Sequence, residues 1–182
     1  MTKDQFQQAA NIGAGLAARW YPHIEATFKE FGITSAVDQA MFIVQFGHNS
    51  AGFTRVVELF NYSVAGLQST FGKRLSKDQC AMLRRQRGES VVPLNRQAAI
   101  ANLVYSGRTG NKAAGDGWKY RGRGIPQITS LDNYPACSTV LKADFVLVPE
   151  LLERDEYAMR AAGGGQQINA AGSVLTLLRS RR

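Results

Sequence analysis

The chain has 182 residues, of which 45% are hydrophobic, so it is long enough and apolar enough to form one domain with a buried core. No apolar stretch follows the polar N-terminus that matches a secretory signal or a membrane span, and we therefore expect a soluble chain made in the cytoplasm. The net charge of +8 is concentrated between Phe71 and Gly124, where twelve Lys or Arg stand against three acidic residues. A concentrated positive charge attracts polyanions, which could be nucleic acid or the anionic polymers of a bacterial envelope. The alternative interpretation is that these residues form a solvated basic surface without a ligand.

The N-terminal third predicts helices. Apolar residues recur at helical spacing from Phe6 to Trp20 and from Ile24 to Phe31, which favours two short amphipathic helices on either side of Pro22. Ser35, followed three residues later by Asp38, caps the start of a further helix. That helix is apolar nearly all round, so we expect it to be buried and to end near Gly47.

The central part predicts two more helices and a glycine-rich loop. The ranges Lys77–Arg87 and Arg96–Tyr105 each carry an apolar stripe, and Pro93 separates them. Six glycines between Ser106 and Gly124 favour an irregular or hairpin-like loop of the kind that often carries catalytic residues. Cys80 and Cys137 lie far apart without metal-type spacing, which indicates buried or idle thiols.

The C-terminal part begins with a predicted helix from Glu150 to Ala162, opened by Pro149 and ended by the glycines 163–165. The residues after 165 differ in character from what precedes them. They combine several aliphatic residues with Arg179, Arg181 and Arg182, which is compatible with a cationic amphipathic segment on anionic lipid or with a tail that packs on the domain or frays.

Three ordered motifs carry the functional signal. They are Gly47-His48-Asn49-Ser50 with Glu58, then Asn61-Tyr62-Ser63, then the run from Gly117 to Thr129 that contains Gly122-Arg123-Gly124 and Gln127. Together they resemble the signatures of glycoside hydrolase family 19, and particularly its phage endolysin branch, over about residues 5 to 162. The resemblance implies a mainly α, lysozyme-like two-lobed helical domain with a small β-hairpin or irregular loop region. Residues 1–162 would form this catalytic domain, and 163–182 a divergent, truncated tail.

The resemblance also assigns roles. Glu58 would be the general base, Asn49 would stand at the position of the general acid, and Thr129 would position the attacking water. Residues expected to bind substrate are His48, Tyr62, Ser63, Trp118, Tyr120, Arg123, Gln127 and Asn133. From the residues alone, Tyr62, Trp118 and Tyr120 fit core aromatics as well as sugar-stacking platforms, His48 fits a structural histidine beside the cleft, and a lone glutamate is by default a surface carboxylate.

Asn49 is the main departure from the family pattern, which has glutamate there. An inverting glycosidase needs two carboxyl groups roughly 6.5–9.5 Å apart, one to protonate the leaving oxygen and one to activate water. An asparagine amide has no proton to give at any usable pH. Ile125-Pro126-Gln127 is a second departure, since proline before the glutamine lacks an N–H and would distort a strand-like edge.

The sequence therefore predicts a peptidoglycan-degrading endolysin-type hydrolase with impaired activity, or an inactive relative that binds peptidoglycan or another partner. We expect no cofactor and no metal, because only His23 and His48 are present and no acid or cysteine cluster has ligand spacing. The expected partners are peptidoglycan glycan strands and a holin-type permeabilising protein, with a monomeric chain acting from the host cytoplasm on the periplasmic wall. Specific nucleic-acid binding is not expected, because no recognition motif accompanies the charge.

Overall fold

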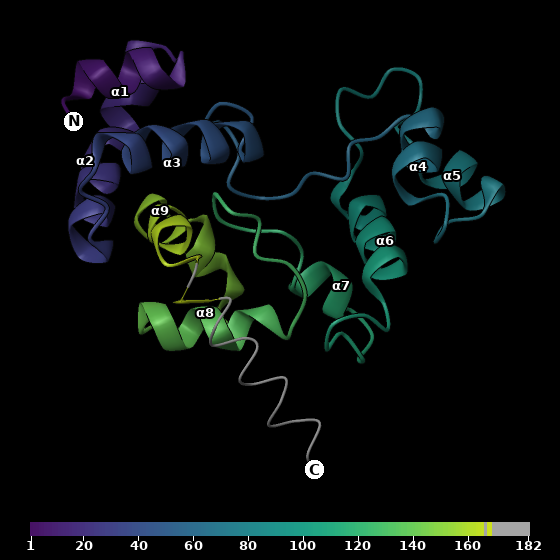
Figure 1. The fold of residues 1–182 in the computed structure, drawn as a ribbon. Coiled ribbons are helices and arrows are strands. Elements are labelled where there is room, and N and C mark those ends of the chain that lie inside the picture. Colours follow the sequence, from purple (N-terminus) through teal and green to yellow (C-terminus); the bar gives the residue numbers. More distant parts are fainter. Residues whose placement is uncertain (166, 169–182) are drawn as a thin grey trace.

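The computed structural model describes residues 1–165, 167 and 168, and over these residues the chain is mainly helical, as predicted (Figure 1). The helices are α1 (Lys3–Ala10), α2 (Ala14–Phe31), α3 (Ala36–Asn49), α4 (Val64–Phe71), α5 (Lys77–Leu83), α6 (Leu94–Tyr105), α7 (Asp116–Lys119), α8 (Asn133–Leu141), the 3-10 helix η1 (Pro149–Glu153) and α9 (Asp155–Gly163). Within the described residues, strand pairing is limited to isolated antiparallel bridges of Arg123 with Val57 and with Ile128.

Two groups of helices stand apart in Figure 1 and are joined by extended segments. In the larger lobe, α1, α2, α3 and α9 enclose one apolar cluster around Trp20 and Phe53, and α8 and α9 enclose a second around Tyr134 and Phe145. In the smaller lobe, α4, α5 and α6 pack around Phe60 and Ile100. Residues 54–63 and the loop after α6 run between the lobes, so functional groups on these segments lie where the lobes meet.

The predicted break at Pro22 is wrong. The chain breaks at Asn11–Gly13, where Asn11 takes a left-handed φ of 49° at the end of α1 and Gly13 begins α2. Pro22 lies inside α2 with its side chain exposed, and Trp20 and Ile24 on either side of it are buried in the same cluster. Burial of one continuous apolar face outweighs the helical hydrogen bond that proline cannot make.

Helix α3 begins as predicted, with the Ser35 hydroxyl accepting a hydrogen bond from the Asp38 N–H at 3.0 Å. It extends two residues past the predicted end, to Asn49. It is also not buried all round: Phe42 and Ile43 face the core, whereas an apolar stripe of Val37, Met41 and Val44 faces solvent, each about two-thirds exposed at 66–67%. Only one face of α3 has a packing partner within the described residues.

The remaining predicted elements differ mainly at their ends. The helix expected over Lys77–Arg87 stops at Leu83, and the helix expected over Glu150–Ala162 is divided at Arg154 into η1 and α9. Gly163 ends α9 and Gly164 caps it, as the glycine run predicted. Helices α4, α7 and α8 were not predicted, and the tail prediction from residue 169 onward lies outside the described residues.

Cys80 and Cys137 are buried free thiols, as predicted. In the described residues, no helix combines the length and the apolar character needed to cross a membrane.

Candidate functional site

Glu58 lies in the extended segment between the lobes, and its position is set by pairing with the loop that follows α7. The Glu58 N–H donates to the Gly122 carbonyl at 2.8 Å, and the neighbouring Val57 bridges Arg123. Phe53 and Phe60, before and after this segment, are fully buried in different lobes. The backbone of Glu58 is thus held from both sides.

The Glu58 carboxylate is partly buried and each of its oxygens accepts one hydrogen bond. Tyr105, the last residue of α6, donates its hydroxyl to Oε1 at 2.8 Å, and the Gly122 N–H donates to Oε2 at 3.1 Å. Burial raises the pKa of Glu58 above its ordinary value, while the Tyr105 and Gly122 donors and the charge of Arg121 act in the opposite direction. The result is an oriented carboxyl group with a perturbed pKa, which is typical of a catalytic acid or base.

Tyr105 stays a hydrogen-bond donor under all ordinary conditions. Burial and the charge of Glu58 raise the pKa of its hydroxyl well above the usual range. Tyr62 lies near the same carboxylate, since burial and then the Glu58 charge raise its pKa as well. Two phenols therefore adjoin Glu58, but only Tyr105 is hydrogen-bonded to it.

Gly122 leaves a small space on which three predicted site residues converge. A Cβ at this position would lie 2.5 Å from Gln127 Oε1, and 3.2 Å from both Glu58 Oε2 and Thr129 Oγ1. Thr129 also donates its hydroxyl to the Gln127 carbonyl at 2.9 Å. The structure thus brings the predicted base, the predicted water-positioning hydroxyl and a predicted substrate-binding amide to one point.

The turn that carries Gln127 is a tight one rather than a strand. Arg123 and Ile128 pair through two backbone hydrogen bonds of 3.1 and 2.8 Å, and Gln127 takes a left-handed φ of 59°. Pro126 occupies the tip of this turn, where no N–H is needed. Because the Arg123–Ile128 pair keeps both hydrogen bonds, the predicted distortion of the edge around Pro126 is not confirmed.

His48 and Asn49 occupy the last turn of α3, and both are exposed. Asn49 Oδ1 accepts a long hydrogen bond of 3.4 Å from Gln45. The chain after α3 is fixed by Phe53, whose ring is buried and whose carbonyl accepts from the Trp20 indole N–H at 2.8 Å. Gly47 makes room for that ring, because a Cβ there would lie 3.3 Å from it.

The other predicted substrate-binding residues have mixed surroundings. Ser63 caps α4, its hydroxyl accepting from the Gly66 N–H at 3.1 Å. Trp118 is partly buried beside Phe60, and the Arg121 guanidinium lies 3.8 Å from the centre of its ring. Asn133 is exposed and donates to the Thr129 carbonyl at 2.6 Å, which links it to the Glu58 site through the backbone.

Tyr120 and Arg123, two of the predicted binding residues, are buried and engaged with other protein groups in this structure. Tyr120 is 4% exposed, packs edge-on against Tyr134 and donates its hydroxyl to the Val146 carbonyl. Arg123 is fully buried and bonds Glu153 at 2.7 Å and the Lys119 carbonyl at 2.6 Å. These residues hold the loop in the structure, and a sequence motif by itself does not distinguish such a structural role from substrate binding.

Sequence reasoning missed Tyr105 as a site residue. It is the last residue of the range Arg96–Tyr105 that was predicted to be a helix, and it ends that helix with a hydroxyl. Its partner is 47 residues away along the chain, so only the packing of α6 against the interlobe segment brings the two together.

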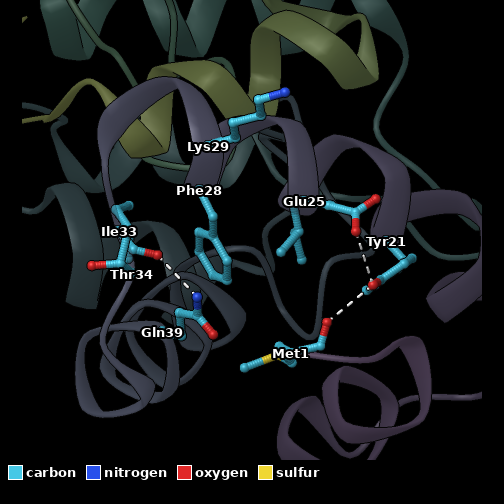
Figure 2. A pocket seen from close by; sticks show the side chains of 9 residues that line it. Met1, Tyr21, Glu25, Phe28, Lys29, Ile33, Thr34 and Gln39 are labelled. Atoms are coloured by element: carbon cyan, nitrogen blue, oxygen red, sulfur yellow. Dashed lines mark hydrogen bonds between the residues drawn. The ribbon is translucent and has the colours of Figure 1, made fainter.

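Glu58 is not among the lining residues of three pockets found in the described part of the chain. One, of about 280 Å³, lies between the N-terminus, α2 and the start of α3 (Figure 2). Figure 2 shows its polar groups engaged with one another: Tyr21 bonds the Met1 carbonyl and Glu25, and Gln39 bonds the Ile33 carbonyl. No paired acid and base converge there, so the chemistry points to Glu58 instead.

Within residues 1–165, 167 and 168, no cluster of three or more His, Cys, Asp or Glu side chains is placed to hold a metal ion. An oriented carboxylate such as that of Glu58 can exchange a proton with a water molecule.

Comparison with known proteins finds a relative of part of this chain. The chain is similar to a protein of Haemophilus influenzae named "Glycosyl hydrolase family 19 domain-containing protein", with 42% identity over 118 residues, which are 64% of this chain and 54% of that protein. The chain thus spans about half the length of the curated relative that it matches. No family model matches the chain. The printed name places that relative, over its own longer chain, among proteins with a glycosyl hydrolase family 19 domain.

Proposed function

We propose that this chain is an endolysin-type glycoside hydrolase of family 19 that acts on the β-1,4 glycan of peptidoglycan, and that its hydrolytic activity is impaired because Asn49 stands at the position of the general acid. The observation that carries the proposal is the Glu58 carboxylate, fixed by Tyr105 and Gly122 beside Thr129 and Gln127. The name of the Haemophilus influenzae relative supports the reaction class.

The proposed role of Glu58 is that of general base. Its carboxylate would take a proton from a water held with the help of Thr129, and that water would attack the anomeric carbon as the glycosidic bond breaks on the opposite face. The donors on Glu58 stabilise its ionised form against burial, which suits a base. Inversion at the anomeric carbon is the expected stereochemical outcome.

The departing sugar oxygen also needs a proton, and Asn49 supplies none. An amide does not titrate, and the exposed Asn49 side chain accepts a long hydrogen bond from Gln45 in the preceding turn of α3. Loss of general acid catalysis lowers a rate by about 10²–10⁴-fold, which corresponds to a barrier increase of roughly 3 to 5 kcal/mol. Poor leaving groups such as sugar alkoxides belong at the upper end of that range.

The test is to restore the acid. Asn49→Glu is expected to raise the release of reducing ends from purified peptidoglycan by at least 10²-fold, because it restores a titratable proton. Its place at the C-terminal end of α3 faces the negative end of the helix dipole, which favours the protonated carboxyl group. Asn49→Gln is the matched control, because glutamine is as long as glutamate but has no titratable proton. It should leave the rate of the unaltered chain unchanged. Glu58→Gln combined with Asn49→Glu should abolish the gain. An unaltered chain as fast as Asn49→Glu would refute the assignment of the donor.

A second candidate function is a non-catalytic peptidoglycan-binding protein, and the residue that favours it is again Asn49. Retention on insoluble peptidoglycan without clearing in a zymogram would support this candidate, whereas clearing by the unaltered chain would support the hydrolase. In either case we propose that the chain reaches the wall from the bacterial cytoplasm after a holin-type partner permeabilises the membrane, and that it acts as a monomer without a cofactor.

A further inference from the structure

A basic pocket of about 630 Å³ adjoins the C-terminal end of α4, in the smaller lobe. Its wall combines the cations Lys73, Arg74 and Arg108 with neutral residues of α4, and no acidic residue lines it. Lys73 and Arg74 follow α4, whereas Arg108 comes from the loop after α6, so two separate segments contribute positive charge to one concave surface.

These three cations have no carboxylate partner in the described part of the chain. Other cations of the same basic segment do: Arg96 pairs with Glu89, and Arg121 and Arg123 pair with Glu153. Lys77, Arg87 and Lys112 of the same segment also lack a salt bridge in the described residues, but they do not line this pocket. What distinguishes Lys73, Arg74 and Arg108 is that they share one concave surface.

Capping of α4 does not account for the cations. Cations after a helix can satisfy its last carbonyls, but here backbone groups do so: the Gly72 N–H bonds the Gln68 carbonyl, and the N–H groups of Arg74 and Leu75 bond the Phe71 carbonyl. The side chains of Lys73 and Arg74 are exposed, and Arg108 belongs to another segment. All three remain available to a ligand.

The pocket lies next to the Glu58 site. Phe71, which lines it, packs edge-on against Tyr62 with ring centres 5.5 Å apart. Arg108 interacts electrostatically with Tyr105, the residue that is hydrogen-bonded to Glu58. A polymer lying across Glu58 would therefore carry its neighbouring substituents toward these cations.

We infer that Lys73, Arg74 and Arg108 form a subsite for an anionic group carried by the wall polymer, and that this subsite favours an anionic glycan over a neutral one such as chitin. The inference rests on the proposed function. The chemistry recognised is a carboxylate or phosphate oxygen, which Lys and Arg bind by charge-assisted hydrogen bonds. Carboxylates are present on the peptides attached to the glycan, and phosphates on anionic polymers of the envelope.

The test compares co-sedimentation of two triple variants with purified sacculi. Lys73→Gln, Arg74→Gln and Arg108→Gln together remove the subsite. Lys77→Gln, Arg87→Gln and Lys112→Gln remove the same charge from exposed positions of the basic segment that do not line the pocket. The first variant is expected to bind sacculi about tenfold more weakly or worse, and the second to bind nearly as the unaltered chain does. Chitin binding should be the same for all three proteins.

Chemical treatment of the sacculi distinguishes the two sources of charge. Hydrofluoric acid removes phosphate polymers, and amidation neutralises carboxylates. If the difference in binding between the subsite variant and the unaltered chain persists after hydrofluoric acid and disappears after amidation, the ligand is a carboxylate. The opposite pattern identifies a phosphate. The single variant Arg108→Gln, in an exposed loop, should show part of the loss even if the triple variant folds poorly. Equal losses in both triple variants, or none in either, would overturn the subsite while leaving the hydrolase proposal intact. Failure of the unaltered chain to bind sacculi at all would overturn both.

Discussion

Arg123→Met tests whether Arg123 holds the loop together or contacts substrate. The guanidinium is fully buried and makes four contacts: to Glu153 at 2.7 Å, to the Lys119 carbonyl at 2.6 Å, to the Tyr134 hydroxyl at 3.1 Å and to Glu150 at 3.2 Å. Methionine fills much of the same volume but replaces none of these bonds. We therefore expect the variant to be clearly less stable.

The loss of stability in Arg123→Met depends on whether each former partner of the guanidinium finds another hydrogen bond. The Lys119 carbonyl loses its bond from Arg123, which costs about 1–3 kcal/mol for a buried acceptor. Tyr134 still donates to the Arg121 carbonyl at 2.7 Å, and Glu150, with 62% of its side chain exposed, regains water. Glu153 is less accessible, at 32%. The total should be about 3 kcal/mol, at the lower end of the range for breaking a buried ion pair.

The assay is urea unfolding followed by the fluorescence of Trp20 and Trp118, which report one lobe each. Arg123→Lys, which keeps the charge but not the planar fork, should lose roughly half as much. Arg19→Met is the matched control: it removes an exposed pair with Asp155 and should change stability by less than about 1 kcal/mol. If Arg123→Met were no more destabilising than Arg19→Met but lost binding to peptidoglycan, Arg123 would be a substrate residue after all.

Three further predictions concern the site and α2. Gly122→Ala places a methyl among three polar side chains, as close as 2.5 Å to one of them. In a chain that also carries Asn49→Glu, it should reduce hydrolysis at least tenfold while changing the midpoint of urea unfolding little. Unchanged hydrolysis would show that this space is not used. Tyr105→Phe removes a hydrogen-bond donor that lowers the pKa of Glu58, so the acidic limb of the pH–rate profile should move to higher pH. Tyr62→Phe is the control, because it removes no hydrogen bond to Glu58, and it should not move that limb. Pro22→Ala should raise the free energy of unfolding by about 1 to 2 kcal/mol, because proline is exposed within α2; a loss of stability would mean that α2 depends on proline for its shape.

Part of the Glu58 site was named from the family resemblance. That resemblance pointed to Glu58, Gln127 and Thr129, and the structure places all three around Gly122. Tyr105 was not named, because a hydrogen bond spanning 47 residues leaves no periodic mark in the sequence. Tyr120 was named as a binding residue but is buried in the core. The sequence did not distinguish these cases, because an aromatic residue beside a glycine turn can pack within a loop or stack on a sugar.

Local sequence was enough to predict the helical class, the Ser35 cap, the end of α9 at the glycine run and the lack of a titratable proton at position 49, because periodicity, capping and side-chain chemistry act over a few neighbouring residues. Local sequence did not predict that α2 continues through Pro22, that Arg123 is a buried ion-pair partner or that Tyr105 reaches Glu58. These outcomes depend on which apolar faces and charges meet across the fold. Their free energies come from burial and pairing between distant segments, and such contacts exist only once the lobes have packed.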